Sequence, residues 1–218
     1  LKVGRATKNQ ILAYLETTTR ATHQSEQLQK KYAAYLPYLL CYPNIRDEIQ
    51  GMADGAGLDF ETLAKLNIVE LESDLEPDRQ CSTFYVEHNG QPIVGHNEDG
   101  REQDDIFILK ASYPSGISIL SLCYFARLPG FSANINSQGL VITCNALHSN
   151  DRATGIPKII FARLLLECES IESMIALLGE NNRAQGQHLL VVGPQQTVSI
   201  EVSASDYQLI RVTGNFYH

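Results

Sequence analysis

The sequence lacks the features that would place the protein in a membrane or on a nucleic acid. Among its 218 residues, no uninterrupted apolar run approaches the length needed to cross a bilayer. Acidic residues outnumber basic ones, 25 against 17, which leaves a formal net charge of −8. The adjacent basic pair Lys30-Lys31 is too small for a binding surface, and we assign it to a solvated helix face. We therefore expect neither a membrane nor a nucleic acid as a partner.

Targeting and linker signals are also missing. Residues 1–10 are mixed and polar and do not form a signal peptide, although the chain does not begin with Met and its true start is left open. Together with the free cysteines, this favours the cytoplasm. The sequence has no Gly/Ser linker, no low-complexity tract and no internal repeat. With 44% hydrophobic and 19% charged residues, the composition is that of an ordinary globular chain.

The five cysteines lack the spacing of a disulfide framework or a metal motif. No two of them form C-x-x-C, and no His joins them at zinc spacing, so we expect no metal and no cofactor. Four lie in apolar stretches, where a small buried side chain is expected: Cys41, Cys123, Cys144 and Cys168. Cys81 differs, because it follows the polar stretch 76–80 and begins a strand pattern.

Helical periodicity dominates the chain before residue 80. The expected helices span 7–40, 45–54 and 60–72. Pro37 and Pro43 are expected to end the first of these helices. Asp59 is a plausible N-cap for the last, because its carboxylate can accept from the free backbone N–H groups of the first turn.

After residue 80 the pattern becomes strand-like. The expected strands span 82–88, 92–97, 106–112, 117–125, 131–136, 139–147, 188–192, 197–203 and 207–213. Two helices are expected between them, one from Pro157 to about residue 168 and one over 170–178. This order predicts an α+β fold in which two antiparallel sheets carry helices packed outside them. Two small domains divided near residue 80 are the alternative.

Local turn chemistry predicts what lies beside Cys81. Asn89-Gly90 between two strand patterns is a strong signal for a two-residue hairpin turn. Pairing that starts with His88 opposite Gln91 brings position 98 opposite Cys81, and a one-residue bulge would bring Asp99 there instead. The polar segment Gly95–Gly100 is therefore expected directly beside the cysteine.

A thiol next to a carboxylate needs a further group before it can react. The thiol is mostly protonated at neutral pH, and a neighbouring carboxylate raises its pKa further. A positive group between the two would resolve this, and the α-amino group of Cys81 itself could be that group. Its release requires cleavage of the bond between Gln80 and Cys81.

Several segments resemble the acyl-coenzyme A:6-aminopenicillanic acid acyltransferase family, within the N-terminal-nucleophile (Ntn) hydrolase superfamily. The resemblance covers nearly the whole chain, and its strength lies in the order and spacing of the motifs. They are Ile49–Gly57 followed by Leu66-Asn67, Cys81–Phe84, Gly95–Asp99, Asn136–Leu140 followed by Asn145–Leu147, and Gly155–Pro157 leading to Arg163.

The resemblance implies a four-layer αββα sandwich and a precursor that cleaves itself before the cysteine. Residues 1–80 would be the helical pro-segment or α-chain portion, and residues 81–218 the Ntn core or β-chain portion. The family continues with a His-Thr-Asn-His-like stretch whose Asn supports the site, whereas this chain stops at His218. The resemblance therefore also implies that the family's C-terminal part is lacking.

The resemblance also implies roles for individual residues. Cys81 would be the nucleophile once Gln80 is released, and Asp99 would orient its free amine. Asn97 would lie beside them, and Asn145 would contribute to the oxyanion hole, the set of donors that binds the developing negative charge.

Structural interpretations of the same residues remain open. Asn97 and Asp99 precede Gly100 and also fit a turn. His96 is expected to point to the face opposite Asn97 and to be structural. Tyr85 and Tyr124 could line a substrate pocket, but core packing is favoured.

The expected activity is the cleavage or transfer of the acyl group of a small amide or acyl-thioester substrate through a Cys81 acyl-enzyme. The sequence does not distinguish a hydrolase from a transferase. It also does not distinguish a monomer from a homo-oligomer. One alternative is a non-catalytic Ntn-fold member kept for binding. Another is a papain-like Cys-His hydrolase, for which His88 lies too far along the hairpin from Cys81.

Overall fold

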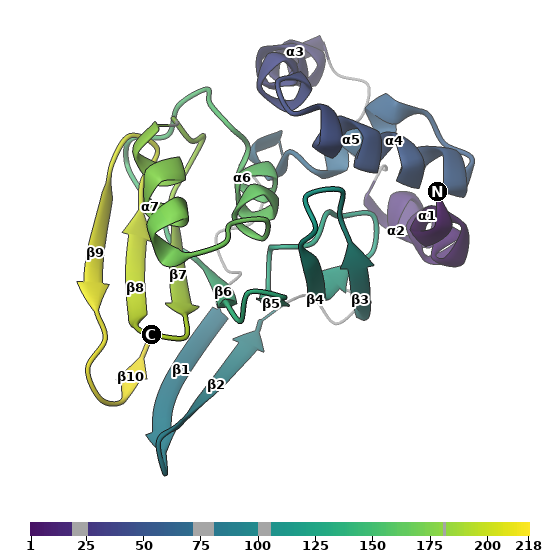
Figure 1. The fold of residues 1–218 in the computed structure, drawn as a ribbon. Coiled ribbons are helices and arrows are strands. Elements are labelled where there is room, and N and C mark those ends of the chain that lie inside the picture. Colours follow the sequence, from purple (N-terminus) through teal and green to yellow (C-terminus); the bar gives the residue numbers. More distant parts are fainter. Residues whose placement is uncertain (19–25, 72–80, 100–105, 181) are drawn as a thin grey trace.

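The computed structural model describes residues 1–18, 26–71, 81–99, 106–180 and 182–218 (Figure 1). Its helices are α1 (Lys2–Ala6), α2 (Lys8–Thr18), α3 (Glu26–Leu40), α4 (Pro43–Ala56), α5 (Phe60–Leu66), α6 (Lys158–Leu165) and α7 (Ile171–Glu180), with a 3-10 turn η1 (Val69–Leu71). Its strands are β1 (Cys81–His88), β2 (Gln91–Glu98), β3 (Ile106–Ser112), β4 (Ser118–Tyr124), β5 (Ala133–Asn136), β6 (Val141–Ala146), β7 (Gln187–Val192), β8 (Thr197–Val202), β9 (Tyr207–Arg211) and β10 (Phe216–Tyr217). None of the helices in these ranges is long and apolar enough to cross a membrane.

The strands form two antiparallel sheets, which confirms the predicted α+β class. The smaller sheet has the order β10-β1-β2, and the larger runs from β3 to β9 in chain order. The expected order of helices, strands, two helices and further strands is also confirmed, but α1 and β10 were not expected and the two prolines were misread. Pro37 lies inside α3, which continues to Leu40. Pro43 begins α4, where its missing N–H costs nothing because first-turn N–H groups have no partner within a helix.

Alternating side chains give the larger sheet two different faces. In β6, Ile142 and Cys144 point into the main core, which also contains Ile159 of α6 and Met174 of α7. Val141, on the opposite face of β6, packs in a second apolar cluster. That cluster joins both sheets: Tyr85, Val94 and Phe216 of the smaller sheet meet Val141, Leu190 and Val192 of the larger. Helices therefore cover one face, and the smaller sheet covers part of the other.

The N-terminal helices share the main core with the larger sheet, which contains both Ile49 of α4 and Ile200 of β8. Asn67 fixes this contact from a fully buried position at the end of α5. Its Nδ2 donates to the backbone carbonyls of Leu63 and Ala126, and its Oδ1 accepts from the backbone N–H of Leu128. The helical segment is thereby attached to the connection that follows β4. The functional division near residue 80 remains a prediction.

Arg163 of α6 occupies a buried charged cluster at the same interface. Its side chain is 0% exposed and contacts Glu48 Oε2 at 2.9 Å and Glu167 Oε1 at 3.0 Å. The guanidinium also lies over the ring of Tyr113, 3.8 Å from its centroid. Tyr113 in turn donates from its hydroxyl to Glu48. The cluster ties α4, α6 and the turn after β3 together.

Removing this arginine should be costly. We expect Arg163→Met to lower the free energy of unfolding by about 3 kcal/mol, because it leaves the partly buried Glu48 carboxylate without its cation. The matched control is Arg46→Met, since Arg46 pairs with Asp47 on the surface and such pairs contribute about 0–1 kcal/mol. Urea unfolding of both variants tests this. Equal losses for the two would contradict the assignment.

Candidate active site

The predicted hairpin and its register are confirmed. Asn89 and Gly90 have φ values of 52° and 71°, the left-handed conformation that a type I′ turn requires. The pairing runs without a bulge from His88 opposite Gln91 to Cys81 opposite Glu98. Residues that face each other in a ladder point to the same side of a sheet, so Glu98 is the residue that the hairpin delivers to the thiol.

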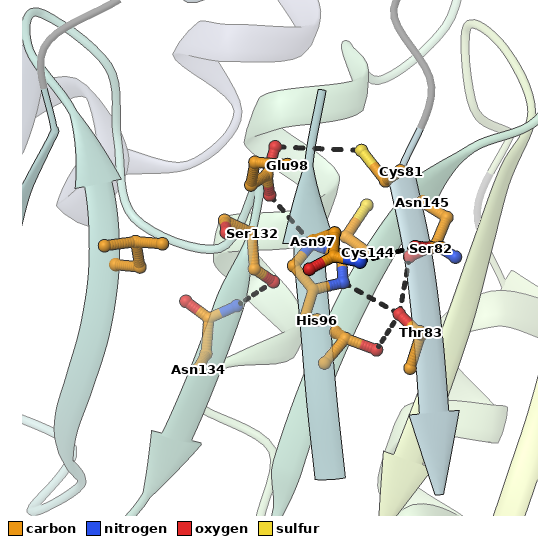
Figure 2. Close-up of polar contacts among 12 residues, drawn as sticks. Cys81, Ser82, Thr83, His96, Asn97, Glu98, Ser132, Asn134, Cys144 and Asn145 are labelled. Carbon is orange, nitrogen blue, oxygen red and sulfur yellow. Dashed lines mark hydrogen bonds and ion pairs between the residues drawn. The ribbon is translucent and has the colours of Figure 1, made fainter. Parts of the chain in front are cut away.

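The thiol of Cys81 is the first member of a chain of polar contacts between the two sheets (Figure 2). Sγ donates to Glu98 Oε2 at 3.7 Å, and the same oxygen accepts from the hydroxyl of Tyr124 at 2.6 Å. The other carboxylate oxygen, Oε1, lies 2.8 Å from Nε2 of His96. Glu98 therefore connects the thiol to an imidazole and to a phenol.

Thr83 carries this chain of contacts onto the larger sheet. Its Oγ1 lies 2.7 Å from Nδ1 of His96 and donates to Asn145 Oδ1 at 2.8 Å. Asn145 is only 1% exposed, and its Nδ2 has no hydrogen-bond partner among the described residues. An unpartnered buried donor is expensive in a folded protein, so it marks a place where a ligand can accept.

Asn97 and Asp99 are not members of this polar cluster. Asn97 is exposed, on the face opposite His96 as expected, and its Nδ2 donates to Ser82 Oγ at 3.0 Å. Asp99 is exposed and directly follows β2, at the end of the hairpin where β1 begins. Gln80 lies outside the described residues. Of the predicted set, the structure brings Cys81 and Asn145 to the same polar cluster.

Sequence reasoning missed three members of this cluster: Glu98, His96 and Tyr124. The signal for Glu98 was present, because the pairing that starts at His88 and Gln91 points to position 98 itself. His96 and Glu98 lie on the same face of β2, because side chains alternate along a strand. The expectation that His96 points away from Asn97 already implied this. Tyr124 was considered as a pocket residue, but core packing was favoured, and nothing in the sequence indicated its contact with Glu98 from the other sheet.

The cysteine predictions were mostly confirmed. Cys123, Cys144 and Cys168 are buried, as their apolar neighbourhoods suggest. Cys41 is exposed, so the prediction for it was wrong. It follows α3, and apolar neighbours in a helix do not determine which way the next side chain faces.

Burial and charge keep the thiol protonated in the intact chain. Burial and the negative charge of Glu98 raise the pKa of Cys81 to about 12, although the backbone N–H of Ala146 acts against them. Burial also acts to raise the pKa of Glu98, but the hydrogen bonds with His96 and Tyr124 help to outweigh it and lower that pKa. The intact site thus pairs a stable carboxylate with a neutral thiol.

This charge balance predicts slow alkylation of Cys81 in uncut chain. At pH 8 a thiol with a pKa of about 12 holds roughly 2,000-fold less thiolate than an ordinary cysteine. A thiolate with a higher pKa is also more nucleophilic, and this increases its rate of reaction by about 40-fold. We therefore expect iodoacetamide to label Cys81 roughly 50-fold more slowly than a free cysteine, with a rate that still rises above pH 9.

Glu98→Gln should speed this labelling, because removing the carboxylate charge lowers the pKa of the thiol. Mass spectrometry of the peptide that still joins Gln80 to Cys81 reports on uncut chain alone. A labelling rate that levels off near pH 8.5, or that falls in Glu98→Gln, would contradict the assignment.

Two facing antiparallel sheets with helices outside, and a polar cluster around a cysteine at the start of a strand, form a sandwich of the Ntn-hydrolase type. The sequence comparison is more specific. Residues 86–218 match the family described as acyl-coenzyme A:6-aminopenicillanic acid acyl-transferase, and the chain belongs to this family. The match begins within β1, after Cys81.

A curated relative has similar chemistry. The chain is 26% identical over 159 residues to the beta-alanyl-dopamine/carcinine hydrolase of Drosophila melanogaster. The alignment covers 63% of this chain and 41% of that protein, so the chain spans less than half of its relative's length. Family and relative together support acyl transfer or amide hydrolysis as the general class of chemistry.

Proposed function

We propose that the protein is a self-processing cysteine Ntn enzyme that cleaves or transfers the acyl group of a small amide or thioester. The observation that carries this proposal is the position of Cys81. It is the first residue of β1, its thiol contacts a carboxylate, and Asn145 nearby offers a buried N–H without a partner. A nucleophile, a proton acceptor and an oxyanion donor are the parts that acyl transfer needs.

In the proposed maturation step, Sγ of Cys81 attacks the carbonyl carbon of Gln80 while its proton passes to Glu98. The peptide C–N bond then breaks, its nitrogen takes up a proton, and a thioester links Gln80 to Sγ. Water hydrolyses this thioester, which leaves a carboxylate on Gln80 and a free α-amino group on Cys81. Glu98 suits the first proton transfer because its carboxylate already accepts a hydrogen bond from the thiol.

In the proposed catalytic cycle, the free α-amino group accepts the thiol proton, since its intrinsic pKa is near 8. The thiolate attacks the substrate carbonyl, and Nδ2 of Asn145 donates to the oxyanion. The leaving amine takes the proton from the α-ammonium, and an acyl-thioester remains on Cys81. Water or a second amine then accepts the acyl group, which decides between hydrolysis and transfer.

Asp99 and Asn97 have supporting roles in this proposal. Asp99 directly follows β2, at the end of the hairpin where Cys81 begins β1, so it can orient the freed amine. Asn97 holds Ser82, the residue after the nucleophile, through its hydrogen bond to Oγ. Both would act by position, because neither contacts the thiol in the intact chain.

The C-terminal strand β10 pairs with β1 and ends close to the nucleophile. The backbone of His218 exchanges hydrogen bonds with Thr83, 2.8 Å from Thr83 N to His218 O and 2.9 Å in the reverse direction. Because β10 runs antiparallel to β1, residues continuing from His218 in this register would pass Ser82 and reach Cys81. The His-Thr-Asn-His-like stretch of the family would place its Asn there.

For the substrate, the name of the relative points to N-acyl amines in which β-alanine is the acyl part. We propose a small amide of this kind. The test is to incubate the full-length protein with β-alanyl amines and with acyl-thioesters and to weigh the fragment that begins at Cys81. We expect a transient gain of one acyl group, absent in Cys81→Ala. Turnover that survives Cys81→Ala would contradict the proposal.

One observation favours a second candidate, a Cys-His hydrolase that works without self-cleavage. Side-chain ligand atoms of Cys81, His96 and Glu98 lie within 4.8 Å of one another in the intact chain. His96 could then accept the thiol proton through Glu98. This candidate requires activity from uncut protein and loss of that activity in His96→Gln.

A further inference from the structure

The three side chains closest to the nucleophile are all potential metal ligands. Cys81, His96 and Glu98 each offer one ligand atom, these atoms lie within 4.8 Å of one another, and all three residues are partly buried (Figure 2). They form no metal motif in the sequence, because pairing of β1 with β2 is what brings Cys81 beside the other two. A search by spacing along the chain therefore could not find them.

The hydrogen bonds around His96 leave one ring nitrogen directed at an acceptor. The hydroxyl of Thr83 has one hydrogen, and it donates to Asn145 Oδ1, which can only accept. Nδ1 of His96 lies 2.7 Å from Thr83 Oγ1, so this side of the ring is held by the hydroxyl. Nε2 faces the Glu98 carboxylate at 2.8 Å and is the ring nitrogen on the side of the thiol.

This arrangement matches the surroundings of a metal-bound histidine. Such a histidine usually donates its other ring N–H to an oxygen acceptor, which fixes the tautomer and the ring orientation. Thr83 takes that place here. Thr83 is itself held between the sheets, with 0% exposure and contacts to Thr143 and Asn145.

The ligand atoms lie close to the separations found around a small tetrahedral ion, but one pair is closer. Ligands at about 2.0–2.3 Å from zinc stand roughly 3.3–3.8 Å apart. Sγ and Glu98 Oε2 are 3.7 Å apart, and His96 Nε2 and Glu98 Oε1 are 2.8 Å apart. The first distance fits two ligands of one ion, and the second has to lengthen by about 0.5 Å when an ion replaces the hydrogen bond.

We propose that Cys81, His96 and Glu98 form a binding site for Zn²⁺. A thiolate, an imidazole and a carboxylate are the donor types that zinc prefers, and three protein ligands leave a fourth position for water. On binding, the S–H bond breaks, an S–Zn bond forms, and the thiol proton leaves to solvent. Zinc in this site occupies the lone pair of the nucleophile, so it would inhibit the enzyme. That consequence rests on the proposed function, whereas binding itself does not.

Cobalt provides a spectroscopic test that does not depend on activity. Titration of the metal-free full-length protein with Co²⁺ should produce a near-ultraviolet thiolate-to-cobalt band and visible bands of a four-coordinate ion. Both should saturate at one equivalent and disappear when Zn²⁺ is added. Cys81→Ser should lack the near-ultraviolet band, and the control Cys41→Ser should keep it, because Cys41 is exposed and lies in another element.

Two further variants separate a metal site from a reactive cysteine alone. Glu98→Gln and His96→Gln each remove a ligand, and each should weaken cobalt binding more than Thr83→Val. The last removes only the support of His96, which typically costs 10–100-fold in affinity. Circular dichroism confirms that each variant is folded.

The inference and the proposed function can fail separately. Absence of the thiolate band, or its persistence in Cys81→Ser, would overturn the metal site even in an active enzyme. A cobalt site in a protein without acyl-transfer activity would leave the metal site standing and count against the proposed function.

Discussion

Replacing Cys81 by Ala should leave the chain uncut and remove its acyl-transfer activity. Loss of a hydrolase nucleophile lowers kcat by up to roughly 10⁶-fold, because the covalent route closes entirely. The substitution should preserve the fold, since Cys81 is only partly buried and its thiol makes weak hydrogen bonds, among them the one to Glu98. Cleavage followed on a denaturing gel and turnover of a β-alanyl amine check the two effects.

Two companion variants make this result interpretable. Cys41→Ala alters an exposed cysteine and should change neither cleavage nor turnover. Cys81→Ser should still cleave, more slowly, because an oxygen nucleophile can carry out the analogous N-to-O acyl shift. Normal cleavage in Cys81→Ala would mean that a protease or another residue cuts the chain.

Asn145→Ala should lower kcat by about 10²–10³-fold, the usual cost of losing one oxyanion donor. This loss is expected because the Nδ2 group of Asn145 is buried and has no hydrogen-bond partner among the described residues. The effect should fall on kcat more than on KM, because the oxyanion exists only after attack has begun. Steady-state kinetics with a small amide substrate measures it.

The matched control for Asn145 is Asn145→Asp. This variant keeps an oxygen that can accept from Thr83 and removes the N–H donor. If the donor matters, both variants lose kcat. If Asn145 only anchors Thr83, Asn145→Asp should retain most of the activity, and the oxyanion assignment would be lost.

The sequence predicted the hairpin well because local chemistry determines it. Asn89-Gly90 adopts the left-handed conformation that few other residue pairs tolerate, and strand alternation then carries the register to Cys81 opposite Glu98. The emphasis on Asn97 came from motif resemblance, and that on Asp99 came from the same resemblance and from a possible bulge that the ladder does not contain. In a strand, the neighbours of Glu98 cannot share its face.

Contacts between the two sheets could not be predicted in the same way. Tyr124 reaches Glu98 from β4, and Asn145 reaches Thr83 from β6. Both contacts depend on how one sheet lies across the other, which no local pattern specifies. Asn145 was nevertheless identifiable, because an amide inside the apolar strand Val141–Ala146 is expected to have a hydrogen-bond partner or a functional role.

Pro37 shows a similar limit for the helices. A proline inside a helix removes one hydrogen bond and strains the preceding turn, so local chemistry favours an end there. In the structure α3 continues past it, and Leu39 is completely buried. Packing of the last turn against the main core outweighs the local preference.

The central claim is that Cys81 becomes a catalyst by being released as an N-terminal residue. The most direct measurement is the intact mass of freshly purified full-length protein. Samples are taken during incubation and denatured before each mass is measured. The account predicts one chain that ends at Gln80 and a second that begins with Cys81, with amide turnover appearing as the two chains form. A chain that stays intact while turning over substrate would contradict it.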